Sequence, residues 1–287
     1  MLAAGILERI GAAMKIGALS WNGNNIGDDI QTIAVMQHIP PVDVFLNREE
    51  LNSYDGPELL LVMNGWFLRD VRNWPPSKAI RPIFFGFHVR RGARETVARH
   101  VDYLRRFQPI GCRDRGTFEF VRSLGVEAYI SYCSTMTFDA PEDRSPDSLY
   151  LVEASLDDVP KRLRRSHGLI VREVSHRFID VPTATRLGYA KELVRTYGRT
   201  AGMVITSRIH CALPCVAMGI PTLFIGQRNY RTELVEEAGL PLNERRPLPM
   251  KLFSPTISEW PKAHDIGALK EKIRGDLRQR VAAALAG

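Results

Sequence analysis

The chain has 287 residues, which is long enough for two packed cores. Hydrophobic residues make up 45% and charged residues 25% of it, a composition that excludes collagen, wholesale disorder and long coiled coils. The formal net charge of +7 favours an anionic ligand, nucleic acid or an anionic membrane surface as partner, without choosing among them.

The first residues do not resemble a secretory signal, because Glu8 and Arg9 interrupt their apolar run. The uncharged stretch 209–227 is broken by Pro214 and Pro221, so it predicts a buried helix followed by a buried strand rather than a membrane span. The 4 cysteines are too few for a disulfide scaffold and predict buried free thiols in a reducing cytoplasm.

Short apolar runs alternate with helical patterns along the chain. In the first half they predict strands at Ile16–Trp21, Val42–Leu46, Leu59–Met63, Ile83–Phe87 and Ala128–Tyr132. Helices are predicted near Asp28–His38, Arg94–Phe107 and Thr117–Leu124. After the polar stretch 139–147, strands are predicted at Leu149–Val152, Leu169–Val174, Met203–Thr206 and Thr222–Ile225. The helices of this half are predicted near Asp157–Arg165, Ala184–Tyr197, Ile209–Met218 and Tyr230–Ala238.

This alternation predicts an α/β fold with parallel sheets, arranged as two Rossmann-like domains that face a cleft. The expected domains are 1–140 and 149–264, followed by a C-terminal helix over 265–287. That helix carries apolar residues at four-residue spacing with basic residues between them, so it either packs back across a domain or touches anionic lipid. Ligands are expected at the carboxyl ends of the strands.

The first candidate site is the segment 20–29, which follows a strand and opens a helix. It matches neither dinucleotide-binding nor P-loop patterns, and Asp28 and Asp29 at the helix start would repel a phosphate. Together with Asn25 they could accept hydrogen bonds from sugar hydroxyls, although Asp28 could equally cap the helix. Asn64 and Trp66 follow the predicted strand Leu59–Met63 at the rim of a loop, where the tryptophan either stacks on a sugar or fills the space between the domains.

Arg113 and Asp114 follow a short apolar run and precede a helix. The guanidinium could bind a carboxylate or phosphate, or pair with a nearby aspartate. Asp114 could cap the helix or take a proton. A stronger signal comes from Arg208 and His210, the only basic residues of a long apolar stretch, which fall at a helix start. They predict an anion site, and the alternative is a core histidine with a satisfied hydrogen bond.

These motifs together resemble the polysaccharide pyruvyl transferase family. Ser207-Arg-Ile-His210 with Gly219-Ile-Pro221 resembles its R-L-H … G-x-P motif, Asn25-Ile-Gly-Asp28 its N-x-G-D start, and Arg113-Asp114 with Gly125 its R-D segment. The resemblance implies a GT-B-like architecture and transfer of a pyruvyl group from phosphoenolpyruvate to a sugar as a cyclic ketal, with no cofactor and no metal. It implies that Arg113, Arg208 and His210 bind phosphoenolpyruvate.

From this chemistry we expect His210 to assist the leaving phosphate, and Asp28 or Asp114 to accept a hydroxyl proton. The acceptor saccharide, free or lipid-linked, is expected at Asn25, Asp28, Asp29, Asn64 and Trp66 in the N-terminal domain. The expected location is cytoplasmic, at the inner membrane face if the acceptor is lipid-linked.

Two other functions stay open. A GT-B-like glycosyltransferase that uses a nucleotide sugar could hold a diphosphate at the same helix start, and Glu233, Glu236 and Glu237 lie in the next predicted helix, where one could bind a ribose. A basic nucleic-acid-binding protein is the second alternative. Because the arginine-rich stretches 90–106 and 161–165 lack interleaved aromatics in a recognisable module, exposed helix faces explain them better and no nucleic acid is expected.

Overall fold

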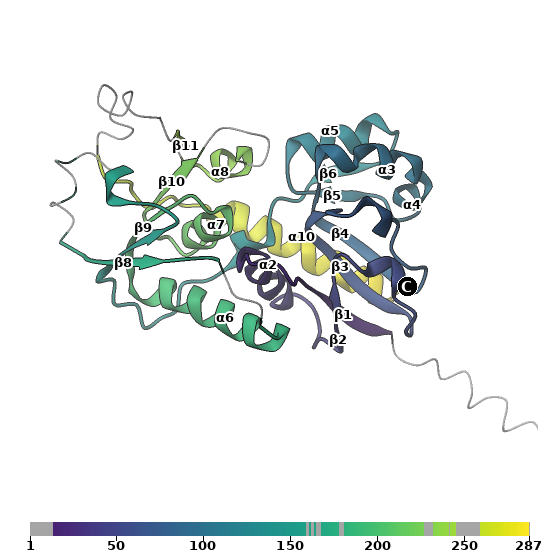
Figure 1. Cartoon of the computed structure of the whole chain (residues 1–287), viewed down its shortest axis with the longest axis horizontal. Helices are drawn as coiled ribbons and strands as arrows, with labels where there is room; N and C mark the ends of the chain where they lie inside the picture. The colour runs from purple at the N-terminus through teal and green to yellow at the C-terminus, as the bar shows by residue number, and fades with distance from the viewer. Residues whose placement is uncertain are drawn as a thin grey trace, which may run out of the picture.

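The computed structural model describes residues 14–158, 161, 164, 168–177, 181–226, 232–240, 242–244 and 259–286. They form two parallel sheets with helices packed against them, which confirms the predicted mixed α/β class (Figure 1). The four cysteines are free and buried, as predicted. Within the described ranges no helix has both the length and the apolar character that a membrane crossing requires.

The first sheet has the strand order β2-β1-β3-β4-β5-β6. Its strands are β1 (Lys15–Ser20), β2 (Val44–Asn47), β3 (Leu59–Phe67), β4 (Ile80–Val89), β5 (Ile110–Cys112) and β6 (Ala128–Ile130). The helices of this half are α2 (Gly27–Met36), α3 (Arg94–Arg99), α4 (Val101–Arg106) and α5 (Arg115–Ser123). The short 3-10 helices of this half are η1 (Leu51–Ser53), η2 (Val71–Asn73), η3 (Arg91–Ala93) and η4 (Ser134–Thr137).

The second sheet has the order β11-β10-β9-β7-β8. Its strands are β7 (Ser148–Val152), β8 (Ile170–Val174), β9 (Ala201–Thr206), β10 (Thr222–Gly226) and β11 (Leu242–Glu244). The helices are α6 (Thr183–Thr200), α7 (Ile209–Ala217), α8 (Glu233–Glu237) and α10 (Gly267–Ala286), and η5 (Leu156–Asp158) is a 3-10 turn. Most of the helix predicted near 157–165 falls outside the described residues.

Two predicted boundaries were wrong. The helix expected over 94–107 is divided at His100, whose ring Nδ1 lies 3.0 Å from the Thr96 carbonyl oxygen and whose backbone leaves the helical region. The strand β3 continues through Asn64 and Trp66, so these residues do not form a loop. Gly65 allows this extension, because its φ of +108° accommodates a shift in register against β4.

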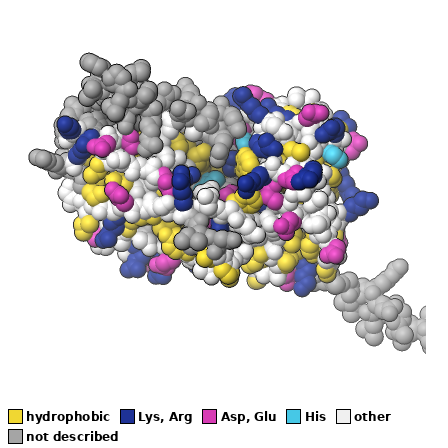
Figure 2. Space-filling view, viewed as in Figure 1, with side chains coloured by type: hydrophobic (Ala, Val, Ile, Leu, Met, Phe, Trp, Pro, Cys, Tyr) yellow, Lys and Arg dark blue, Asp and Glu magenta, His cyan; other side chains and the backbone are white. Residues whose placement is uncertain are grey.

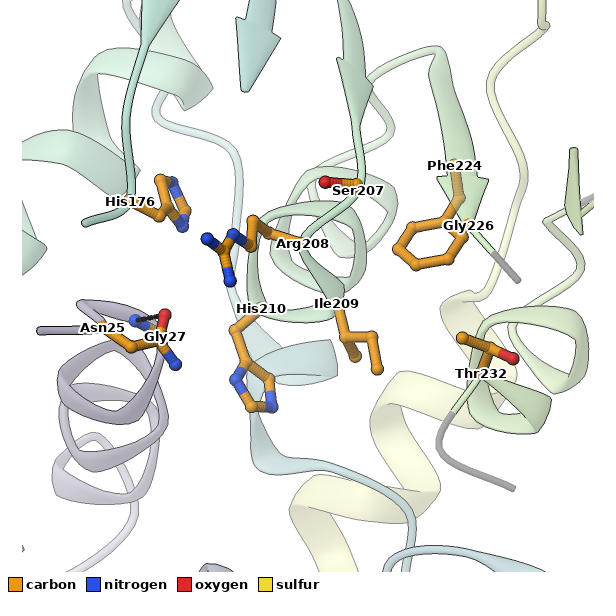
Figure 3. A pocket seen from close by; sticks show the side chains of 10 residues that line it. All are labelled: Asn25, Gly27, His176, Ser207, Arg208, Ile209, His210, Phe224, Gly226 and Thr232. Atoms are coloured by element: carbon orange, nitrogen blue, oxygen red, sulfur yellow. Dashed lines mark hydrogen bonds between the residues drawn. The ribbon is translucent and has the colours of Figure 1, made fainter. Parts of the chain in front are cut away.

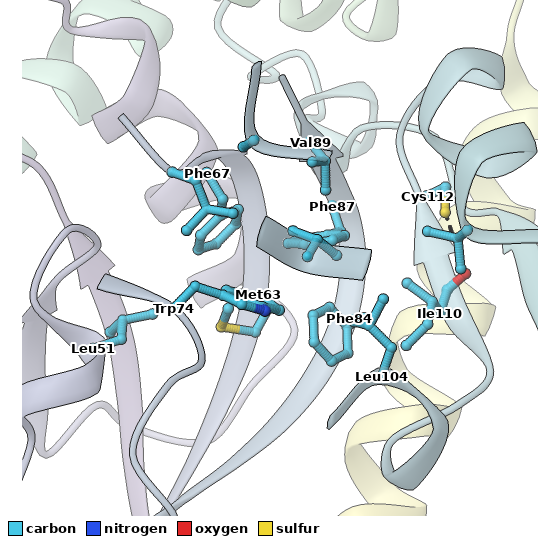
Figure 4. Packing of buried hydrophobic residues seen from close by; sticks show 14 of the residues in the cluster. Leu51, Met63, Phe67, Trp74, Phe84, Phe87, Val89, Leu104, Ile110 and Cys112 are labelled. Carbon is cyan, nitrogen blue, oxygen red and sulfur yellow. Dashed lines mark hydrogen bonds between the residues drawn. The ribbon is translucent and has the colours of Figure 1, made fainter. Parts of the chain in front are cut away.

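The core of the first half fills the space between its sheet and the helices on one face. Figure 4 shows Met63 and Phe67 of β3 against Phe84 and Phe87 of β4, with Trp74 beside them. The rings of Phe84 and Phe87 meet edge to face at 4.8 Å. This packing holds the neighbouring strands in register, so the loops at their carboxyl ends start from a rigid edge.

The two halves are packed on one another through α2. Its residues Ile26 and Ile30 lie in one buried cluster with Leu187 and Val194 of α6. The C-terminal helix α10 also connects the halves (Figure 1): Ile273 and Leu277 are buried among residues of both. Because this apolar face is buried, α10 packs against the protein itself. Packing of this kind was one of the two arrangements predicted for the C-terminal helix.

Candidate functional site

A cavity of about 230 Å³ lies where the start of α2 meets the start of α7. We call it the α2–α7 cavity. Figure 3 shows Asn25 and Gly27 on one side, Arg208 and His210 on the other, and His176 above them. The lining residues are Asn25, Gly27, His176, Ser207, Arg208, Ile209, His210, Phe224, Gly226 and Thr232. The structure therefore brings together the helix start that contains Asn25 and the Arg208–His210 motif, which are far apart in the chain.

The helix α7 opens directly onto this cavity. Arg208 is its N-cap residue with an extended backbone, and the Arg208 amide donates to Thr206 Oγ1 at 2.9 Å. The first turn contains no acidic residue, and its N–H groups carry the positive end of the helix dipole. An anion in the cavity would meet this helix end together with the Arg208 and His210 side chains.

Arg208 is held by a carboxylate from a neighbouring strand end. Arg208 Nη2 lies 3.7 Å from Glu153 Oε2, directly after β7. Glu153 also accepts hydrogen bonds from Ser175 Oγ at 2.7 Å and from the His176 amide at 3.0 Å. Burial would raise the pKa of Glu153, but these hydrogen bonds and the Arg208 charge outweigh it and lower the pKa. The sequence analysis missed Glu153, although its place after a parallel strand was an available signal.

Asp28 lies next to the cavity in the first turn of α2. Its carboxylate accepts hydrogen bonds from Arg48 Nη1 at 2.7 Å, from Asn25 Nδ2 at 3.3 Å and from Gln31 Nε2 at 3.3 Å. Burial would raise the pKa of Asp28, but Arg48 above all, together with the charges of His210 and Arg113, lowers it. Asp28 is therefore ionised at neutral pH and does not cap α2 with its side chain.

Arg48 was also missed by the sequence analysis. It follows β2 directly, and its side chain is 4% exposed. The guanidinium carbon lies 4.5 Å from the centre of the Trp21 ring and 5.9 Å from that of Trp66. Trp66, a residue of β3, thus packs beside Arg48. Neither Trp66 nor the buried Asn64 lines the α2–α7 cavity. Their predicted contact with an acceptor sugar stays a prediction.

Arg113 is buried at the end of β5, and its Nη1 donates to Gln31 Oε1 at 3.4 Å. Through Gln31 it reaches Asp28, but it does not line the α2–α7 cavity. Asp114, the next residue, caps α5 by accepting from the Thr117 amide at 2.9 Å. Its other oxygen lies 2.5 Å from His88 Nδ1. Burial would raise the pKa of Asp114, but His88 and Arg113 lower it. The capping alternative for Asp114 therefore fits the geometry.

Asp29 faces away from the cavity. Both of its oxygens accept hydrogen bonds from Arg186 of α6, at 2.7 Å from Nη2 and 3.2 Å from Nε, and both side chains are 1% exposed. Burial raises the pKa of Asp29 against the opposing effect of Arg186. The contact ties α2 to the second half, so the geometry gives this carboxylate a packing role. Its predicted contact with an acceptor sugar stays a prediction.

The arginine-rich stretches considered for nucleic-acid binding form local ion pairs where the structure describes them. Arg99 and Arg105 of the arginine-rich stretch 90–106 pair with Glu95 and Asp102 on their own helices. Figure 2 shows Lys and Arg side chains interspersed with acidic ones on this face. The stretch 161–165 is described only at Lys161 and Arg164, and the side chains of Glu233 and Glu237 fall outside the described residues. In the described ranges no group of three or more His, Cys, Asp or Glu is arranged for a metal ion.

Comparisons with known proteins bear on the fold and the family of the chain. The chain is similar to the crystal structure of a functionally uncharacterized protein from Klebsiella pneumoniae, with a TM-score of 0.50 and 14% identity over 82% of this chain and 92% of that one. This likeness concerns the fold alone. No curated protein matches the chain. The family model for polysaccharide pyruvyl transferases matches residues 25–229, a span that includes Asn25, Arg113, Arg208 and His210. The chain therefore belongs to the polysaccharide pyruvyl transferase family.

Proposed function

We propose that the protein transfers the pyruvyl group of phosphoenolpyruvate to a saccharide, forming a cyclic ketal, and that phosphoenolpyruvate binds in the α2–α7 cavity. The observation that carries this proposal is the convergence of Arg208, His210 and the start of α7 on one small cavity. Phosphoenolpyruvate presents a carboxylate and a phosphate close together. A guanidinium, an imidazole and the N–H groups of a helix start are suited to bind both.

The reaction that we propose uses two sugar hydroxyls. Protonation of C3 makes C2 electrophilic, the first hydroxyl oxygen adds to C2, and the C2–O bond to phosphate breaks. The second hydroxyl then adds to C2 and closes the ketal. The two hydroxyl protons balance the one gained by C3 and the one that leaves with inorganic phosphate.

The roles of individual residues follow from their positions. His210 lines the cavity and would protonate the departing phosphate. Asp28 is ionised and touches Asn25 of the cavity wall, which makes it a better candidate than Asp114 for accepting a hydroxyl proton. Both Asp114 oxygens are already engaged by Thr117 and His88. Arg113 would contribute charge from behind Asp28 rather than direct contact with the donor.

The two parallel sheets fit a GT-B-like arrangement in which residues 1–140 bind the acceptor and 149–264 the donor, with α10 as the returning helix. A cytoplasmic location goes with the donor that we propose. The acceptor would be a saccharide of a polysaccharide or of its lipid-linked precursor.

Calorimetric titration of phosphoenolpyruvate tests the donor assignment. We expect binding to the native protein and a loss of at least about tenfold in affinity in Arg208→Ala, because a hydrogen bond to a charged group contributes about 1.5–3 kcal/mol. Arg99→Ala is the matched control, since the described side-chain contacts of Arg99 are with Glu95 and Thr96 of its own helix. UDP-glucose and GDP-mannose serve as competitors. Binding of a nucleotide sugar without binding of phosphoenolpyruvate would instead identify a glycosyltransferase.

A further inference from the structure

A second and larger cavity lies at the carboxyl edge of the first sheet. It measures about 620 Å³ and is separate from the α2–α7 cavity in its lining. We call it the sheet-edge cavity. It is lined by Trp21, Asn22, Gly23, Asn47, Glu49, Glu50, Arg69, Asp70, Val71 and Arg90. These residues stand at or just beyond the ends of four adjacent parallel strands, β1 to β4.

We infer that the sheet-edge cavity binds a sugar unit of the acceptor, an inference that rests on the proposed function. Its volume falls within the range of about 300–1,000 Å³ typical of small-molecule sites. The lining offers an indole ring, two amide side chains, three carboxylates and two guanidiniums. Such a mixture of donors and acceptors, with one more carboxylate than guanidiniums, suits a ligand rich in hydroxyls better than a phosphate.

The Trp21 ring at this cavity is in contact with the Arg48 guanidinium. The Arg48 guanidinium lies 4.5 Å from the Trp21 ring centre, and its Nη1 is bound to Asp28 at 2.7 Å. The buried Arg48 cation therefore packs against the Trp21 ring, and Trp21 also forms part of the cavity wall. A rigid aromatic wall of this kind can pack against the apolar face of a sugar ring.

Two buried polar atoms near this ring have no hydrogen-bond partner among the described residues. Arg48 Nε and Glu49 Oε1 lie 3.9 Å apart, and both are buried without a hydrogen bond in the described part of the chain. The second Glu49 oxygen accepts from the Asp70 amide at 3.2 Å, which fixes the side chain at the cavity. After a small shift of these side chains, one hydroxyl could donate to Glu49 and accept from Arg48.

The two cavities are connected through a single loop. Trp21 to Gly23 line the sheet-edge cavity, and Asn25 lines the α2–α7 cavity. Asp28 hydrogen-bonds Asn25 on one side and Arg48 on the other. Arg186 of α6 donates to the Gly23 carbonyl at 2.5 Å and fixes the loop. The Arg48–Asp28 pair therefore lies between the two cavities, and a saccharide that extends from the sheet-edge cavity past this pair would present its reacting hydroxyls at the α2–α7 cavity.

Saturation-transfer NMR with simple glycosides tests this inference. The probes are the methyl glycosides of galactose, glucose and mannose, with lactose and cellobiose as disaccharides. We expect saturation transfer from the native protein to at least one probe. In Trp21→Ala and Glu49→Gln the affinity for that probe should fall at least tenfold. Glu58→Gln is the matched control, because Glu58 is exposed and precedes β3 at the opposite edge of the sheet.

The donor site serves as the internal reference. Phosphoenolpyruvate should bind Trp21→Ala as it binds the native protein, and the glycoside should still bind His210→Asn. Trp21→Phe, which keeps a ring against Arg48, should retain part of the glycoside affinity and guards against misfolding of the alanine variant. If no probe binds the native protein, or if Trp21→Ala and Glu49→Gln bind it undiminished, the inference is wrong. Glycoside binding without phosphoenolpyruvate binding would overturn the donor assignment alone.

Discussion

Arg48 Nη1 lies 2.7 Å from Asp28 Oδ1, in a pair whose side chains are 4% and 13% exposed. The two residues come from different strand–helix connections of the first sheet and meet between the two cavities. Because water is largely excluded from the pair, each charge depends on the other for its stabilisation.

We therefore expect Arg48→Met to destabilise the protein by about 3–5 kcal/mol at pH 7, since it leaves Asp28 buried without its main partner. In the native protein the lowered pKa of Asp28 contributes stability above the pKa of the unfolded chain, and this contribution is lost as the pH falls through the folded value. The variant should lose this acid dependence. Urea unfolding at pH 7 and pH 3 measures both effects. Arg81→Met, which removes a half-exposed arginine 3.9 Å from Glu58, should cost about 1 kcal/mol or less.

The pair of Asp29 and Arg186 leads to a second prediction. Asp29→Ala should cost about 3–5 kcal/mol, because it leaves the Arg186 guanidinium buried and without its carboxylate. Asp29→Leu combined with Arg186→Met should recover most of this loss, since two apolar side chains can fill the space. Denaturant unfolding of the two single variants and the double variant gives the coupling energy.

The same variants separate packing from acceptor binding at Asp29. If the double variant folds and binds the glycoside probe like the native protein, then Asp29 only joins α2 to α6. A folded double variant that no longer binds the probe would return Asp29 to the acceptor site.

Features set by residues near one another in the chain were predictable from the sequence, whereas contacts between distant residues were not. The helix starts at Gly27 and Ile209 were predictable, because each follows a buried parallel strand and their place in the chain fixes their place at the sheet edge. The partner of Asp29 was not predictable, because Arg186 lies 157 residues further along the chain. Tertiary packing alone brings the two together.

Arg48 and Glu153 show a different limit. Each stands at the carboxyl end of a strand, where the sequence analysis expected ligands, yet neither belongs to a motif that attracts notice. Arg48 pairs with Asp28, and Glu153 pairs with Arg208. In each pair the two residues follow different strands, so the sequence gives no sign that they meet. Trp66 was placed in a loop because the apolar run ends at Met63, whereas the register shift at Gly65 carries the strand further.

A third prediction concerns His38, which is buried and lies with Nε2 2.9 Å from Thr137 Oγ1. Burial, with the nearby charges of Arg278 and Arg274, lowers the pKa of His38 to about 4. The unfolded chain binds this proton near pH 6.5, so stability is fully present above that value and falls as the pH drops towards 4. Between these limits the native protein should lose at most about 3 kcal/mol through this group.

His38→Gln tests this contribution, because glutamine keeps a polar group near Thr137 and does not titrate. The free energy of unfolding of the variant should change less between pH 7 and pH 4.5 than that of the native protein. Equal changes in the two proteins would show that His38 takes up its proton as readily in the folded state as in the unfolded chain, and would contradict the prediction. His100→Gln is a suitable control, since His100 is less buried and contacts only a turn of its own helix among the hydrogen bonds described.

The last prediction concerns the close approach of α2 to His210. A Cβ atom at Gly27 would lie 3.0 Å from His210 Nδ1 and 3.2 Å from His210 Cβ. Gly27→Ala must therefore turn the imidazole or move the start of α2 away from α7. We expect the affinity for phosphoenolpyruvate to fall by about tenfold or more, because the geometry of a binding site must be kept to about 0.5 Å.

Gly275→Ala in α10 provides the matched control, since a Cβ there meets no atom within 4 Å. Alanine is favoured over glycine in a helix by about 1 kcal/mol, so this variant should be slightly more stable and bind phosphoenolpyruvate unchanged. The same preference keeps Gly27→Ala folded, so its weaker binding can be attributed to the site. If calorimetry gave the same affinity for Gly27→Ala and the native protein, the packing of His210 against α2 would not matter for the donor.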